Sequence, residues 1–104
     1  IHSHIKQQDE YTFIFEEQAS TGEKIAAILK TTPPALSSDF APSQRSIFLQ
    51  DCRLLSRTNA TIQYYFVSDA CIFNIIEKKY KQYLGTIQLI LLPKAIADQH
   101  SLHA

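Results

Sequence analysis

The longest nearly unbroken apolar stretch of the chain, residues 86–92, places the strongest constraint on its fold. Gln88 is its one polar interruption beyond Thr86, Gly85 precedes it and Pro93 ends it. An apolar run of this length between Gly and Pro predicts a β-strand that is covered on both faces. Such strands usually lie parallel to a neighbour, which requires a crossover connection. The stretch therefore predicts a central, parallel strand in a mixed α+β domain.

Length and charge limit the number of domains and the classes of partner that this chain can have. The chain has 104 residues, which corresponds to one domain, and its ten basic and ten acidic residues give no net charge. This balance does not favour nucleic acid or an anionic membrane as the partner of the whole domain. The part up to Cys52 is acidic and the part after it is basic. We interpret these parts as two solvated faces, or as a charge asymmetry that orients a partner.

The ends of the sequence and its cysteines indicate the context of the domain. The chain begins at Ile1 and contains no Met, so we expect a fragment of a larger intracellular, cytoplasmic protein. It has no signal-peptide pattern and no apolar run of the ~20 residues that a membrane span needs. Cys52 and Cys71 are too few for a disulfide framework. We expect reduced thiols, with a single bridge as the alternative.

The first half of the chain predicts a hairpin followed by a helix. Residues 1–7 alternate and residues 11–15 are β-branched and aromatic, so they favour two strands joined by a polar turn. Ser20 and Glu23 have the spacing of a capping box, which predicts a helix over residues 20–30. Prolines and serines predict a loop over 33–43.

The second half predicts further strands and a second helix. Residues 46–49 favour a third strand, with residues 52–55 as its continuation or as a fourth, and residues 61–67 favour another strand. Residues 70–84 favour a helix, because Ser68-Asp69 can cap its start and Gly85 its end. The alternative makes residues 71–76 a strand paired with 61–67.

The order of these elements, ββαββαβ, resembles the ubiquitin-like β-grasp roll, in which the last strand lies parallel to the first. Residues 42–48, with Leu54 beyond, resemble the stretch of ubiquitin that leads into its third strand, and residues 86–91 resemble its last strand. The additional elements over 62–84 and the ending 89–94 resemble Ras-association and Ras-binding domains of fungal MAP-kinase-kinase kinases. The resemblance implies a single β-grasp domain over 1–94, and the polar composition after Pro93 predicts a disordered tail over 95–104.

The resemblance also implies a function. Ras-binding domains add their second strand to the sheet of a small GTPase, with basic residues on that strand and on the first helix. The acidic residues that flank the second strand here would repel an acidic GTPase face. If the domain is ubiquitin-like instead, Phe48 on the third strand is a candidate docking residue, or else part of the core. The candidate partner-binding residues are Lys6, Tyr11, Phe13, Lys24, Lys30 and Phe48.

Catalytic patterns are weak in this sequence. The histidines form two terminal pairs, His2/His4 and His100/His103, which the expected strand order places far apart, so we expect no metal site. No interior His could activate a cysteine, and no glycine-rich phosphate loop is present. Lysines and tyrosines interleave over 78–83, but at helical spacing the lysines point outward.

We therefore expect no enzymatic activity, no cofactor, and neither nucleic acid nor membrane as a partner. The expected function is protein–protein interaction within a larger signalling protein, recruiting it to a small GTPase. The alternatives are an embedded ubiquitin-like docking domain, which the ubiquitin pathway would recognise, and a structural assembly domain that self-associates.

Overall fold

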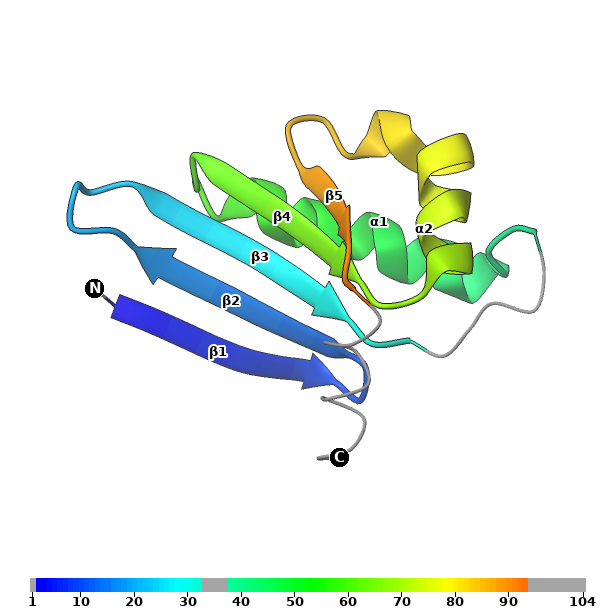
Figure 1. Ribbon diagram of the computed structural model, residues 1–104, viewed down its shortest axis with the longest axis horizontal. Coiled ribbons are helices and arrows are strands. Elements are labelled where there is room, and N and C mark those ends of the chain that lie inside the picture. The colour runs from blue at the N-terminus through cyan, green and yellow to red at the C-terminus, as the bar shows by residue number, and fades with distance from the viewer. Residues whose placement is uncertain (1, 33–37, 94–104) are drawn as a thin grey trace.

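The computed structural model describes residues 2–32 and 38–93, and side chains from residue 5 onward (Figure 1). In it, a five-stranded sheet is combined with two helices. The elements are β1 (His2–Asp9), β2 (Thr12–Gln18), β3 (Lys24–Lys30), α1 (Pro42–Arg57), β4 (Ile62–Val67), α2 (Ala70–Ile75) and β5 (Gln88–Leu91).

The strands follow one another in the sheet in the order of the chain, β1-β2-β3-β4-β5. The first three form an antiparallel meander, while β4 pairs parallel to β3 and β5 parallel to β4. Each parallel pair needs a crossover, and α1 and α2 lie in these two connections. The predicted mixed α+β class is therefore confirmed.

The β-grasp order is not confirmed. It requires the last strand to lie beside the first, but β1 and β5 form opposite edges of the sheet. Residues 86–92 do supply a parallel strand, as predicted, but their central position was wrong. Among the described residues, β5 pairs only with β4, and Leu91 is 38% exposed. The apolar residues of β5 therefore lie at an edge of the sheet, where Leu89 packs against the core, and not on a strand between two others.

The predicted helix over 20–30 was wrong, because residues 24–30 form β3, the middle strand of the sheet. The Ser20–Glu23 pattern belongs to a hairpin turn. The Ala19 N–H donates to the Glu23 carbonyl (2.8 Å) and the Gly22 N–H to the Ala19 carbonyl (2.9 Å). Gly22 has φ of 92°, a left-handed conformation that glycine adopts at little cost and that reverses the chain.

The predicted strands at 46–49 and 52–55 were also wrong, because both lie within α1. Phe48, Cys52 and Leu55 are buried and follow one another at helical spacing, so they face the core together. Pro42 occupies the first helical position, where its missing N–H costs nothing. The Gln44 side chain accepts a hydrogen bond from the Ala41 N–H (2.9 Å) and so caps the helix start.

Several predicted elements are confirmed. The opening hairpin is β1–β2 and the strand at 61–67 is β4. The predicted helix over residues 70–84 is confirmed, and its strand alternative over 71–76 was wrong, since α2 continues through a π-helical turn, Ile76–Tyr80, and a 3₁₀ turn, Lys81–Tyr83. The Asp69 carboxylate accepts from the Ile72 N–H (2.9 Å), as the predicted cap requires. The predicted tail over 95–104 lies outside the described residues.

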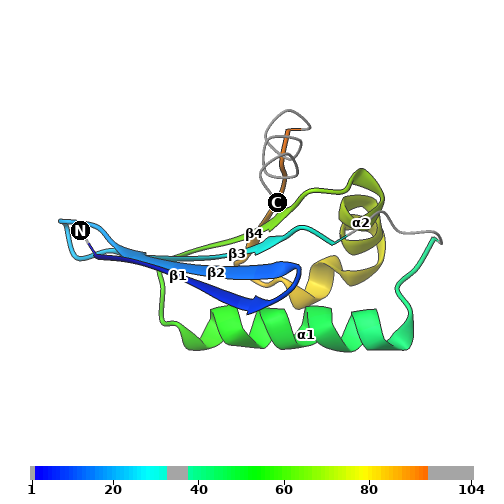
Figure 2. The same ribbon diagram turned by 90° about the horizontal axis from the view of Figure 1, so that it is seen from below.

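Both helices pack against one face of the sheet and enclose the core. Figure 2 shows α1 running along that face, with no described element over the opposite face of β1, β2 and β3. No helix among residues 2–32 and 38–93 combines the length and apolarity needed to cross a bilayer. The buried core cluster is formed by Ala26, Ile28, Phe48, Cys52, Leu55, Tyr65, Val67, Ile72, Ile75, Ile76, Tyr80, Leu84 and Ile87.

We predict that Phe48→Ala lowers the free energy of unfolding by about 3–5 kcal/mol, because a cavity would replace a ring that is 2% exposed. Ile47→Ala, one residue earlier and 43% exposed, should cost less than about 1 kcal/mol. Urea unfolding of both variants measures the difference. Similar, small losses would place Phe48 on the surface, as a docking residue requires.

Candidate functional site

One face of the sheet forms a continuous apolar surface that the described helices leave uncovered. Residues paired across a sheet point to the same side. Phe13, Leu29, Phe66 and Ile90 form one such row across β2, β3, β4 and β5. The neighbouring rows add more apolar residues. We define the open face as Phe13, Phe15, Ile25, Ala27, Leu29, Ile62, Tyr64, Phe66 and Ile90.

The open face is separate from the core. None of its residues belongs to the buried core cluster or to the side chains packed against that cluster. All of them are half-buried except Ala27, which is buried. The rings of Tyr64 and Phe66 lie 5.4 Å apart. Among described residues at these paired positions of β2–β5, Glu17 is the only charged one. The face therefore offers apolar contact and little charge.

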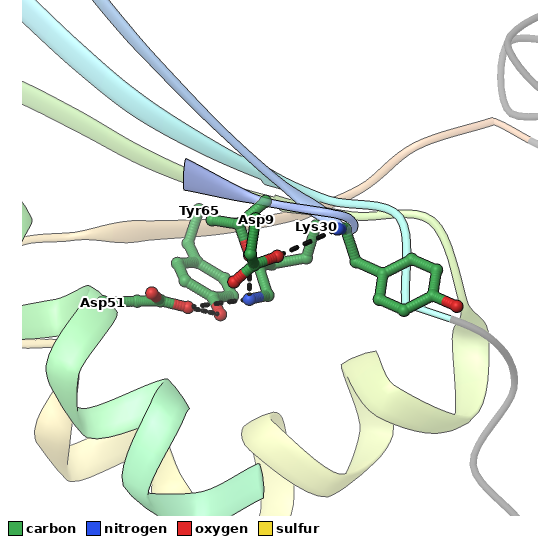
Figure 3. A network of polar contacts seen from close by, with 6 residues as sticks. Asp9, Lys30, Asp51 and Tyr65 are labelled. Carbon is green, nitrogen blue, oxygen red and sulfur yellow. Dashed lines mark hydrogen bonds and ion pairs between the residues drawn. The ribbon is translucent and has the colours of Figure 1, made fainter. Parts of the chain in front are cut away.

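The opposite face of the sheet holds a buried ion pair near the carboxyl end of β3. The Lys30 ammonium lies 3.2 Å from the Asp51 carboxylate on α1, and both side chains are almost fully buried. Lys30 also donates a hydrogen bond to the Thr12 hydroxyl on β2. The Tyr65 hydroxyl on β4 donates to Asp51 (2.8 Å). Figure 3 shows Asp9, Lys30, Asp51 and Tyr65 gathered between the strand ends and the helices.

The ionisation of this network reflects its burial. Burial raises the pKa of Asp51, against the attraction of Lys30 and the hydrogen bond from Tyr65. Burial also raises the pKa of the Tyr65 hydroxyl, and the neighbouring Asp51 charge adds to this. At Asp9 partial burial opposes ionisation, but hydrogen bonds from Tyr11 and Thr12 and the charge of Lys30 hold its pKa below the usual range. The titratable groups of Asp9 on β1, Lys30 on β3 and Tyr65 on β4 therefore all influence the ionisation of Asp51 on α1.

A pocket of about 260 Å³ opens beside this network. Asp9, Glu10 and Tyr11 form one side, at the β1–β2 turn. Its other sides come from the segment before α1, from the first turns of α1 and from α2. Besides those three residues and Lys30, the lining is Thr32, Phe40, Gln44, Ile47, Phe48, Tyr65 and Ile72.

The structure separates the six candidate residues of the sequence into three places. Tyr11, Lys30 and Phe48 line this pocket, while Lys6 and Lys24 line a second hollow beside the last turns of α1. Phe13 lies on the open face, on the other side of the sheet. The secondary structure predicted for these candidate residues was partly wrong. Lys24 and Lys30 belong to a strand and not to a helix, and Phe48 is buried in α1 and not exposed on a strand.

Groups able to perform nucleophilic or metal chemistry are not assembled in the described part of the chain. Burial raises the pKa of the Cys52 thiol to about 12, with a further contribution from Asp51, so a thiolate is unfavourable there. Cys71 is exposed on α2. Within residues 2–32 and 38–93 no three His, Cys, Asp or Glu side chains form a metal-binding group. The expectation for the four histidines concerns side chains outside those described.

Sequence reasoning missed most of the open face, although a signal was present. Residues 25–29 are apolar without interruption, and residues 62–67 are apolar except for Gln63. Such runs indicate strands with apolar side chains on both faces. The first run was interpreted as a helix because Ile25, Ile28 and Leu29 also fit helical spacing.

Comparisons of this chain with models of protein families, with curated proteins and with solved structures found no match.

We predict that Asp51→Leu lowers the free energy of unfolding by about 3–5 kcal/mol, because it leaves the buried Lys30 ammonium without its counter-charge. The double variant Lys30→Met/Asp51→Leu should recover much of this loss, since no buried charge remains. Urea unfolding of the two single variants and the double variant gives the coupling energy.

The exposed ion pair between Lys81 and Glu77 is the matched control, since its coupling should stay below about 0.5 kcal/mol. Equal coupling energies for the two pairs would contradict a special role for Lys30 and Asp51.

We predict that Asp9 stabilises the fold above its unfolded pKa, 3.8, and that this contribution is lost as the pH falls through its lowered folded value. The stability difference between the wild type and Asp9→Asn should therefore shrink between about pH 5 and about pH 2. Urea unfolding at several pH values tests this, with Glu10→Gln as a neighbouring control. A difference that grows on acidification would contradict the prediction.

Proposed function

We propose that this chain is a non-catalytic protein–protein interaction domain, and that its open face binds an amphipathic helix of a partner protein. The observation that carries the proposal is the continuous apolar surface across β2–β5, opposite the helix-covered face. Contiguous apolar patches that remain partly exposed to solvent on a single domain can mark interaction sites.

The topology indicates a helix as the occupant. Strands β3, β4 and β5 run parallel, and all-parallel sheets occur almost only with helices on both faces, whereas the antiparallel β1–β3 part of a sheet can leave one face open. Here α1 and α2 supply the cover of one face. A helix from a partner would complete the second layer, with its apolar stripe on the row of Phe13, Leu29 and Phe66.

The size of the face favours a helix over a second copy of the sheet. Four strands about 4.8 Å apart and five residues of about 3.3 Å give roughly 300–400 Å² in projection. A stable protein–protein interface needs about 800 Å² from each partner. A helix is about 10 Å wide, so three or four helical turns fit on the face. Binding through this face should therefore be weak for a helix and for a second copy alike, and the dimensions of the face suit the narrower helix.

The Ras-association and ubiquitin-like versions of an interaction domain predict other contacts. The first places Lys24 and Lys30 on a partner, but Lys30 is occupied by Asp51 and Thr12. The second uses Phe48, whose ring is 2% exposed. The present proposal rests on neither, and titration with a GTP-loaded Ras-type GTPase, with its GDP form as control, tests the first directly.

We predict that a designed 14-residue amphipathic helix of leucine and lysine shifts the amide signals of β2, β3 and β4 in the labelled chain. A peptide of the same composition, with its leucines distributed around the helix, should cause much smaller shifts, because it presents no apolar stripe. Phe66→Gln should weaken binding at least tenfold, since it places an amide at the centre of the face.

Two further variants make this test decisive. Leu29→Gln places the same change on β3 and replaces Phe66→Gln in the binding test if Phe66→Gln unfolds the domain. Ile47→Gln is the matched control, because Ile47 is exposed on α1, away from the open face. Shifts concentrated on α1 and α2, or equal weakening by Phe66→Gln and Ile47→Gln, would refute the proposal. A mass that doubles with concentration and returns to the monomer in Phe66→Gln would assign the face to self-association instead.

A further inference from the structure

The pocket at the β1–β2 turn combines aromatic rings with carboxylates, and it lies on the side of the sheet opposite the open face. Phe40, Phe48 and Tyr65 form an aromatic wall, with the Phe48 and Tyr65 rings in edge-to-face contact, 5.5 Å apart. Tyr11, 37% exposed, stands in the turn beside Asp9 and Glu10. Aromatic faces attract cations through their quadrupole.

The charges at the pocket sum to a negative value. Lys30 lies in the lining, but Asp51 behind it neutralises its charge. The start of α1 adds roughly half a positive charge. The carboxylates of Asp9 and Glu10 outweigh that half-charge, so an anion would be repelled and a cation attracted.

The volume limits the size of the ligand. About 260 Å³ lies below the ~300–1,000 Å³ typical of sites for whole small molecules. It is sufficient for one side chain. Among cationic side chains, the arginine guanidinium is planar, stacks on aromatic rings and donates two parallel hydrogen bonds to a carboxylate. A lysine ammonium offers no planar surface for stacking.

We infer that this pocket receives a single arginine side chain of a partner protein. Its guanidinium stacks on Tyr11 and pairs with Glu10 at the rim, while its methylene groups lie against Ile47 and Phe40. This site is independent of the open face, because the two lie on opposite sides of the sheet.

The probe for this site is arginine with its amino group acetylated and its carboxyl group methylamidated, so that the guanidinium carries the only charge. Titrated into the labelled chain, it should shift the amides of residues 9–12 and 44–48 and leave those of β5, which contributes no residue to the pocket, unchanged. The capped citrulline analogue, which has the same shape without the charge, should bind at least tenfold more weakly. Salt at about 1 M should weaken arginine binding, because it screens the charges at the rim.

Glu10→Gln and Tyr11→Leu should each weaken binding about threefold, the size expected for one exposed charge or one exposed cation–π contact. Glu17→Gln removes an equal charge from the other side of the sheet and should change nothing. Equal binding of arginine and citrulline, the same effect of Glu10→Gln and Glu17→Gln, or an absence of shifts at tens of millimolar probe would overturn the inference. None of these outcomes bears on helix binding at the open face, so the two proposals fail separately.

Discussion

The ion pair of Lys30 and Asp51 is the interaction on which the arrangement of sheet and helix depends. Two buried charges are tolerated only when each is paired and hydrogen-bonded, and here Thr12 and Tyr65 provide those bonds. The pair joins the end of β3 to the middle of α1, and through its partners it also reaches β2 and β4. A helix shifted by one residue along the sheet would leave both charges buried without partners. The network therefore selects one position of α1 among the many that apolar packing alone would allow.

A fixed α1 divides the molecule into two different surfaces. On its side of the sheet, the aromatic contacts of Phe48 with Phe40, Tyr65 and Tyr80 fill the core and leave a small acidic pocket at the β1–β2 turn. On the other side, the apolar side chains of β2–β5 have no helix of their own among the described residues. Parallel strands with only one covered face are uncommon, because their side chains are apolar in both directions. The same sheet thus supports the core of the domain on one side and carries the open face, on which the proposed binding rests, on the other.

The two proposed sites differ in their physical basis. The open face would bind by removing apolar area from water, which is tolerant of sequence and depends on the pattern of a partner helix. The pocket would bind one charge in a defined position, which contributes little affinity but selects among partners. A partner with a helix on one face and an arginine reaching the other edge would contact both. Neither site requires proton transfer or a nucleophile, which fits the inert environment of Cys52.

Elements whose signals are local can be predicted from the sequence alone. The hairpin of β1 and β2, the strand β4, the Asp69 cap and the left-handed Gly85 all follow from neighbouring residues. The secondary structure of residues 24–30 and 42–57 depends on tertiary contacts, because their apolar spacing suits a strand and a helix almost equally. Pairing with β2 and β4 on both sides makes the first a strand, and burial of Phe48, Cys52 and Leu55 against the sheet makes the second a helix. The open face and the pocket depend on those two choices, and for that reason sequence reasoning brought together only some of their residues.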